Sequence, residues 1–174
     1  MTLLRFELDP DLTPALRAEI VTLWTEVSNA GGAVGFVPPV TEERVRPTAE
    51  KQFAGLGGPG GDRLLVGYAG ERVAAVLFFE DQRFDLMDHW RLLKRVMVHP
   101  ASQGLGYGAQ LLAEAERVAR GWGLAGLRLT LRGGHGLERF YARSGYVEVG
   151  RVPGAIRVGP GDDRDDVTMW LELR

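Results

Sequence analysis

The sequence predicts an α/β fold in which helices cover both faces of a mixed β-sheet. Strand-like segments and amphipathic helical segments follow one another in an order typical of such a fold. The chain has 174 residues, of which 45% are hydrophobic, so it is long enough for one domain with a buried core. No internal repeat and no linker divides it, and we expect residues 1–174 to form a single domain.

The first elements are a short strand over residues 3–8 and a helix that begins at Pro14. Thr13 is a suitable N-cap, and proline is favoured at the first helical position. The helix ends at residues 29–32, and a loop over residues 33–40 follows. Apolar side chains with helical spacing predict its buried face: Leu16, Ile20, Leu23, Trp24 and Val27.

A second helix starts near Thr41. Pro47 is expected to kink it or split it in two, because proline has no N–H and clashes with the preceding turn. The glycine-rich residues 55–62 form a loop, since no helical pattern follows them. Residues 63–68 and 72–80 are expected to form a β-hairpin.

The C-terminal half begins with an acidic, aromatic segment over residues 81–90. The elements expected after it are a strand over 92–99, a helix over 109–120, a strand over 127–132, a short helix over 137–144, and strands over 146–151 and 167–173. An acidic loop is expected between the last two strands.

Composition excludes several functional classes. The net charge of −2 lacks the basic excess typical of nucleic-acid binders, so no nucleic-acid partner is expected. The chain has no cysteine, and its three histidines lack a metal-ligand spacing, so we expect no metal. No apolar run reaches the roughly 18 residues that span a bilayer, and the N-terminus lacks a signal-peptide pattern. We therefore expect no membrane association and a cytoplasmic location.

The segment most informative about chemistry is the glycine turn over residues 103–109, which joins the strand ending at 96–98 to a helix. Pro100 stops the strand, and Gly104, Gly106 and Gly108 leave backbone N–H groups uncovered. The first N–H groups of a helix have no internal partner and lie at the positive end of its dipole. Such a turn suits a pyrophosphate.

Two classes of ligand fit this turn. Residues 104–109 match G-x-G-x-x-A, a dinucleotide fingerprint, and Arg132 on the next strand could contact a 2′-phosphate. A dinucleotide-binding fold normally carries this motif on its first strand, so an NADP-dependent oxidoreductase is the less favoured alternative. The other spacing is Gln103-x-x-Gly106-x-Gly108.

With that spacing, and with RFYARSGYVEVG at residues 139–150, the chain resembles the GNAT superfamily of acyl-CoA-dependent N-acetyltransferases. The resemblance implies a single-domain, mostly antiparallel central sheet, with acetyl-CoA as co-substrate and a small-molecule primary amine as acceptor. It implies that Tyr141 is the catalytic acid that protonates the departing thiolate. The implied coenzyme-binding residues are Val96, Met97, Val98, Gln103, Gly104, Leu105, Gly106, Tyr107, Gly108 and Ala109. Arg139 and Arg143 are further candidates for the 3′-phosphate, and a homodimer is a family-level expectation.

The sequence departs from the family pattern at three positions. Gly134 replaces a common asparagine, and Leu92 and Leu129 stand where a glutamate often acts as the base. The base is then one of Glu80, Asp81, His89 and His99, or the amine arrives already neutral. The missing glutamates also leave open a sensor that binds acetyl-CoA without turnover.

Residues 29–40, 89–100 and 145–173 are similar to segments of tabtoxin-resistance-type acetyltransferases. That resemblance implies an amino-acid-like acceptor, with antibiotic or toxin detoxification as one role, and places Gly35, Phe36 and Val37 at the substrate pocket. The same residues also suit an ordinary helix-connecting loop. The acidic residues 81–90 could attract a cationic amine or form a solvated loop.

Overall fold

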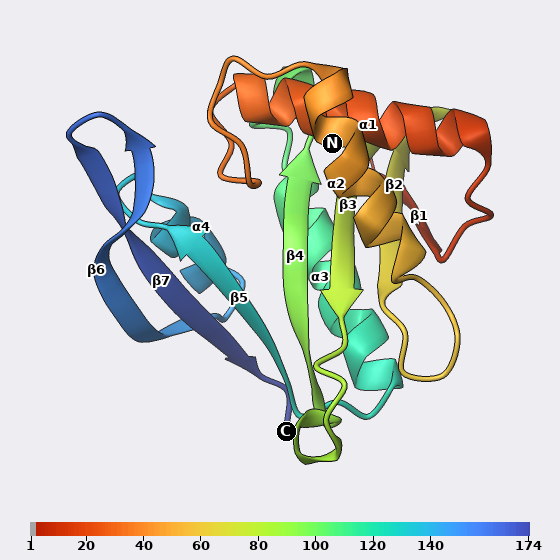
Figure 1. Ribbon diagram of the computed structural model, residues 1–174. Coiled ribbons are helices and arrows are strands. Elements are labelled where there is room, and N and C mark those ends of the chain that lie inside the picture. Colours follow the sequence, from red (N-terminus) through yellow and green to blue (C-terminus); the bar gives the residue numbers. More distant parts are fainter. Residues whose placement is uncertain (1–2) are drawn as a thin grey trace.

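The computed structural model describes residues 3–174 (Figure 1). Within this range the strands form one seven-stranded sheet in the order β1-β2-β3-β4-β5-β7-β6. Neighbouring strands are antiparallel except for β4 and β5, which confirms the mixed, mostly antiparallel sheet. The strands are β1 Arg5–Leu8, β2 Arg63–Ala69, β3 Arg72–Glu80, β4 Trp90–Val98, β5 Gly126–Arg132, β6 Val147–Gly159 and β7 Asp162–Glu172. The α-helices are α1 Pro14–Asn29, α2 Glu42–Ala54, α3 Tyr107–Gly121 and α4 Leu137–Ala142.

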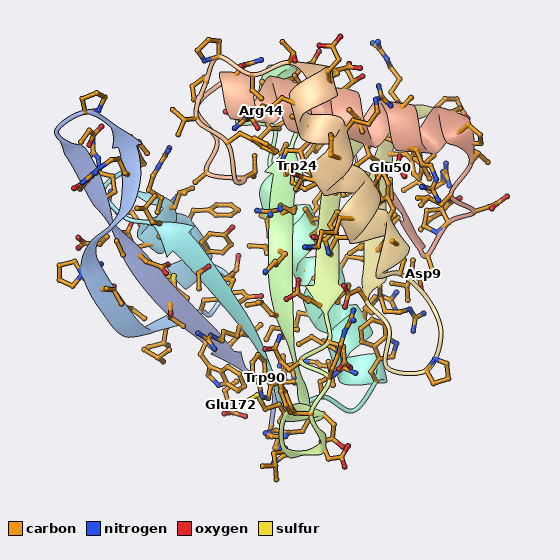
Figure 2. The ribbon with its side chains drawn as sticks, in the orientation of Figure 1. Asp9, Trp24, Arg44, Glu50, Trp90 and Glu172 are labelled. Atoms are coloured by element: carbon orange, nitrogen blue, oxygen red, sulfur yellow. The ribbon has the colours of Figure 1, made fainter. Side chains whose placement is uncertain are left out.

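Helices cover both faces of the sheet, as expected (Figure 1). We call the side that carries α1 and α2 the α1 face; Trp24, labelled in Figure 2, and Phe53 are buried there. The side that carries α3 and α4 is the α3 face, where Leu111 and Tyr141 are buried. Each fully buried side chain of this size contributes about 1.5–3 kcal/mol, so the two cores hold the helices against the sheet.

Helix α1 begins where the sequence indicates. The Thr13 hydroxyl accepts a hydrogen bond from the Leu16 N–H at 3.2 Å, and Pro14 occupies the first turn. Helix α3 starts at Tyr107, two positions before the expected Ala109. Gly106 precedes it with a φ of 82°, a left-handed conformation that glycine adopts without a steric penalty. The glycine turn therefore leads directly into the helix.

Helix α2 continues through Pro47, so of the expected kink or split, the split does not occur. Val45, Ala49 and Phe53 lie four residues apart and are all buried, so one continuous stripe contacts the core on both sides of the proline. This burial offsets the hydrogen bond that Pro47 cannot make.

The acidic loop expected between the last two strands is also wrong, because β6 and β7 extend into a long hairpin. Their antiparallel pairing reaches Gly159 and Asp162, with Pro160 and Gly161 at the turn. Cross-strand ion pairs replace apolar alternation along the hairpin: Arg151 lies 2.8 Å from Asp165, and Arg157 lies 2.7 Å from Asp163.

The parallel strands β4 and β5 pair over only a short length. The ladder joins Trp90–Leu92 to Gly126–Arg128 and ends there. At this paired end the indoles of Trp90 and Trp170 contact each other, with centroids 6.1 Å apart, and a side chain at Gly126 would overlap Trp170. Beyond Leu92 the two strands diverge (Figure 1), which opens the sheet near its centre.

Candidate functional site

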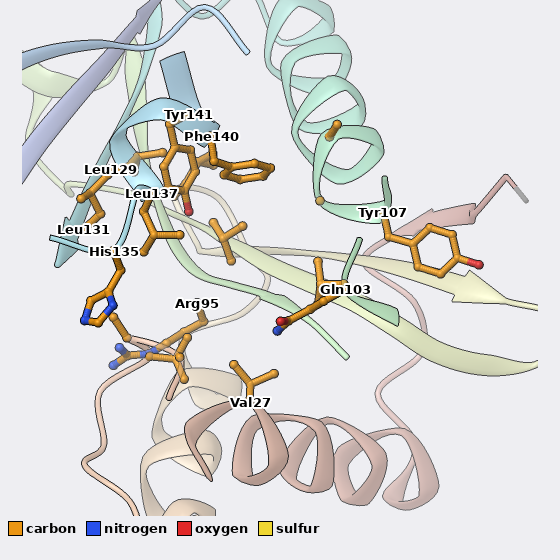
Figure 3. Close-up of a pocket in the computed structure, with 18 of the residues that line it drawn as sticks. Val27, Arg95, Gln103, Tyr107, Leu129, Leu131, His135, Leu137, Phe140 and Tyr141 are labelled. Atoms are coloured by element: carbon orange, nitrogen blue, oxygen red, sulfur yellow. The ribbon is translucent and has the colours of Figure 1, made fainter. Parts of the chain in front are cut away.

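A cavity of about 800 Å³ occupies the gap between β4 and β5 (Figure 3). Its walls come from the diverging parts of both strands, from the start of α3, from α4 and from residues 32–34. The wall includes Val27 and Val34 of the α1-face core, together with Leu129 and Leu131 of the α3-face core. The cavity therefore passes through the sheet from one face to the other. Its size is in the range of small-molecule sites.

The glycine turn forms the α3-face end of the cavity. Gly104, Gly106 and Gly108 all line it, and Gly104 and Gly106 have φ values of 82°. A β-carbon at Gly108 would lie 2.9 Å from the Phe140 ring, so only glycine fits without moving that ring. The first N–H groups of α3, which have no partner within the helix, are placed beside the cavity.

Most of the residues expected at the coenzyme line the cavity, but two side chains do not. Those on the wall are Val96, Val98, Gln103, Gly104, Gly106, Tyr107, Gly108 and Ala109. Met97 is fully buried in the α1-face core, and Leu105 is exposed to solvent. Of the two arginines suggested for a phosphate, Arg143 lines the cavity and Arg139 does not.

Tyr141 is buried and lines the cavity, and Figure 3 shows its hydroxyl directed toward the interior. Its ring contacts those of Phe140 and Tyr146, with centroids 5.0 Å and 5.8 Å away. Burial raises the pKa of Tyr141 well above the ordinary tyrosine value, because the phenolate would lose its solvation. The neighbouring Phe140 lines the cavity as well.

None of the candidate bases lines the cavity. Each has a local partner instead: Glu80 lies 3.3 Å from Lys94, Asp81 lies 2.7 Å from Arg91, and His89 lies 3.7 Å from Asp88. His99 pairs with Glu26 at 2.8 Å, and its Nδ1 accepts a hydrogen bond from the Ala101 N–H. The acidic segment 81–90 is likewise outside the cavity wall.

The ionisable side chains that do line the cavity are mostly basic. Among residues 3–174 they are Lys94, Arg95, Tyr107, His135, Tyr141 and Arg143, and no carboxylate is among them. Sequence reasoning missed Lys94 and Arg95, although two adjacent cations within an apolar strand are a visible signal. His135, two residues before α4, lines the cavity as well.

The wall on the α1 face is formed by Gly32, Ala33 and Val34 rather than by residues 35–37. The Val34 carbonyl accepts a hydrogen bond from the Trp24 Nε1–H at 2.8 Å, which holds the loop against α1. Phe36 packs edge-on against Trp24, and Val37 is exposed beside the β6–β7 turn. Gly35 lies against the Arg95 side chain instead of the cavity.

Three further observations concern the dinucleotide alternative, the membrane and metal ions. Arg132 donates a hydrogen bond to the Gly31 carbonyl at 2.7 Å, so it is not placed beside the glycine turn. Within residues 3–174, no helix is long and apolar enough to cross a membrane. The same residues contain no cluster of three or more histidine or acidic side chains that could hold a metal ion.

Comparison with known proteins gives one family and many related folds. Residues 17–146 match the model of the acetyltransferase (GNAT) family. The structure of a protein provisionally named phosphinothricin N-acetyltransferase superposes with a TM-score of 0.79 at 22% identity, covering 98% of this chain and 99% of that one. YncA of Salmonella typhimurium, a provisional acetyltransferase solved with its cofactor acetyl-CoA, superposes with a TM-score of 0.74 at 21% identity. The match covers 99% of this chain and 95% of that one. The ribosomal-protein-alanine N-acetyltransferase of Brucella melitensis superposes with a TM-score of 0.73 at 21% identity. The match covers 98% of this chain and 99% of that one.

Proposed function

Because this chain belongs to the acetyltransferase (GNAT) family, we propose that it transfers the acetyl group of acetyl-CoA to the primary amine of a small molecule. The family membership makes the chain a GNAT N-acyltransferase that uses acetyl-CoA. The single observation that carries this proposal is the cavity through the sheet. It joins the glycine turn on the α3 face to a wall of small residues on the α1 face. A donor and an acceptor can therefore meet inside it from opposite sides.

The donor half of the cavity fits an extended, amide-bearing molecule with a diphosphate. Beyond Leu92 the edge of β4 that faces β5 is not paired with it, so its backbone groups can bond to amides as an added strand. The N–H groups at the start of α3 suit the diphosphate. We assign the donor to Val96, Val98 and residues 103–109 on this basis.

In the transfer, the amine nitrogen forms a bond to the acyl carbon and the carbon–sulfur bond breaks. The amine loses a proton to solvent, and the sulfur takes the proton of the Tyr141 hydroxyl, which solvent then replaces. Burial raises the pKa of Tyr141, so the phenol is protonated when the transfer begins. The same shift makes it a weaker acid, so its contribution is expected at the lower end of the range for a positioned acid. Since none of the described residues on the cavity wall is a carboxylate, we propose that the amine reaches the acyl carbon in its neutral form.

An amino-acid-like acceptor is the class we favour, with antibiotic or toxin detoxification as one role. This class is proposed from the resemblance of residues 29–40, 89–100 and 145–173 to tabtoxin-resistance-type acetyltransferases. Membership of the tabtoxin-resistance-type subgroup, a homodimer and a cytoplasmic location stay predictions.

The test is release of free thiol from acetyl-CoA in the presence of a panel of primary amines and amino acids. We expect thiol release that depends on at least one amine. Binding of acetyl-CoA by calorimetry, without thiol release for any amine in the panel, would instead favour the sensor.

A further inference from the structure

Arg95 projects from β4 into the α1-face side of the cavity wall without an acidic partner. Its guanidinium lies over the Trp24 ring, 4.9 Å from the centroid. Its Nε is buried and has no hydrogen-bond acceptor, and within residues 3–174 it forms no ion pair. Buried charges are normally paired, because removing a charge from water is costly. An unpaired guanidinium beside a cavity is therefore suited to an anionic ligand.

The backbone presents this side chain through a β-bulge. Val76 pairs with Met97 and Phe78 pairs with Lys94, so β4 has one residue more than β3 between these pairs. Arg95 lies in the bulge with a φ of 52°, a left-handed conformation that is unfavourable for a non-glycine residue. Bulges of this kind re-aim side chains next to functional sites. A β-carbon at Gly35 would lie 3.0 Å from the Arg95 Nη1, so the glycine leaves room for the guanidinium.

The charges around Arg95 also favour an anion. Lys94, the neighbouring cation on the wall, already has Glu80 at 3.3 Å. Burial lowers the pKa of Arg95 while the more distant Glu80 opposes that effect, and an arginine remains charged at neutral pH in any case. With no carboxylate on the described wall, the ligand must supply the negative charge.

We propose that Arg95 binds a carboxylate of the acceptor, so that the substrates are amines that also carry a carboxylate, of the α-amino acid type. This inference rests on the proposed acetyl transfer. Arg95 stacks on α1, whereas the glycine turn that suits the diphosphate leads into α3 on the other face, so the anion is assigned to the acceptor and not to the donor. The guanidinium fork matches a carboxylate in two parallel hydrogen bonds, which fixes the orientation of the amine relative to the cavity. Gly32 and Ala33 leave space there for the rest of a small molecule.

The first experiment compares α-amino acids with their α-amides, which keep the primary amine and lose the negative charge. We expect the kcat/KM of the wild-type protein to be at least about tenfold higher for the best amino acid than for its amide. The amide has the less basic amine and so more of the reactive neutral form, and the preference therefore cannot come from amine ionisation. Arg95→Gln should abolish the preference while acetyl-CoA affinity, measured by calorimetry, stays unchanged.

Two further variants separate recognition from folding. Arg95→Lys keeps the charge but not the fork, and should retain only part of the preference. Arg128→Gln is the matched control, because Arg128 also lies over a tryptophan with an unpartnered Nε but does not line the cavity. It should leave the preference intact. Thermal unfolding establishes that each variant is folded.

A binding measurement tests the inference without turnover. The N-acetyl derivative of the preferred amino acid is titrated into the protein in the presence of coenzyme A. We expect Arg95→Gln to weaken its binding by at least about tenfold relative to the wild type. Equal affinity in the two proteins, or equal kcat/KM for amino acids and amides, overturns the role of Arg95. The two claims can fail separately. If the amides are acetylated as well as the amino acids, the role of Arg95 fails but acetyl transfer to an amine is supported. If thiol is released from acetyl-CoA in the absence of any amine, the proposed function itself is contradicted.

Discussion

The rings of Tyr141 and Tyr146 pack edge to face, with centroids 5.8 Å apart and an interplanar angle of 70°. Both side chains are buried, and burial raises the pKa of each hydroxyl. Only Tyr141 lines the cavity, however. The two tyrosines therefore share an environment but differ in access to a ligand, which makes Tyr146 a natural control for any role of Tyr141.

Tyr141→Phe removes the hydroxyl and keeps the ring contacts. We expect kcat to fall by roughly 10²-fold, the lower end of the range for a positioned acid, because a thiolate is a fairly good leaving group. Acetyl-CoA affinity should change little, the pattern of an interaction made mainly in the transition state. Steady-state kinetics and calorimetry measure the two quantities. Tyr146→Phe should leave kcat within a small factor of the wild type, and full kcat in Tyr141→Phe would remove Tyr141 as the acid.

The raised pKa of Tyr141 sets the expected pH dependence. Burial disfavours the phenolate, so Tyr141 keeps its proton as the pH rises to about 10, where an ordinary tyrosine loses half of it. The ratio of wild-type to Tyr141→Phe kcat should therefore stay constant between about pH 8 and about pH 10. A ratio that falls toward one within that range would mean that the hydroxyl ionises with an ordinary pKa, contrary to its buried position.

Tyr146→Phe should stabilise the protein. The Tyr146 hydroxyl is buried and has no hydrogen-bond partner within residues 3–174, and an unsatisfied buried polar group is unfavourable. Removing it should raise the free energy of unfolding by about 1 kcal/mol, measured by urea denaturation at neutral pH. A loss of stability would show that the hydroxyl has a partner in solution.

Gly108→Val should weaken acetyl-CoA binding. Any β-carbon there meets the Phe140 ring at 2.9 Å, and the larger side chain would also fill the space beside the first turn of α3. We expect at least a tenfold loss of affinity by calorimetry, equivalent to about 1.4 kcal/mol. Gly121→Ala at the other end of α3 is the control, since its β-carbon meets nothing within 4 Å. Unchanged affinity in a folded Gly108→Val protein would place the donor elsewhere, and comparable binding of NADPH would revive the dinucleotide alternative.

The sequence predicts the fold well wherever one pattern of burial decides the structure. The helix after Thr13 and the hairpin of β2 and β3 follow from local periodicity and capping. The extended β6–β7 hairpin does not, because residues 151–166 are held by charge pairs such as Arg157 with Asp163 instead of by alternating apolar side chains. A polar, glycine-rich segment of this kind has the composition of a loop.

The sequence predicts the glycine-turn side of the candidate site but not the α1-face wall or Arg95. The glycine turn is a local motif, so most of its residues could be placed at the cavity in advance. The α1-face wall depends on tertiary contacts, among them the hydrogen bond that Trp24 donates to the Val34 carbonyl, which holds the loop beside α1. The role of Arg95 depends on a bulge that is defined only when β4 pairs with β3. Pairing register and bulge position are not encoded in a single strand.

The most direct test of acetyl transfer follows the acetyl group itself. Acetyl-CoA carrying a deuterium-labelled acetyl group is incubated with the protein and an α-amino acid panel, and mass spectrometry locates the label. We expect the label on the amine nitrogen of an acceptor in equal amount to the coenzyme A released, and we expect Tyr141→Phe to slow both together. Release of coenzyme A with the label found only as free acetate, or no release with any acceptor, would contradict this expectation.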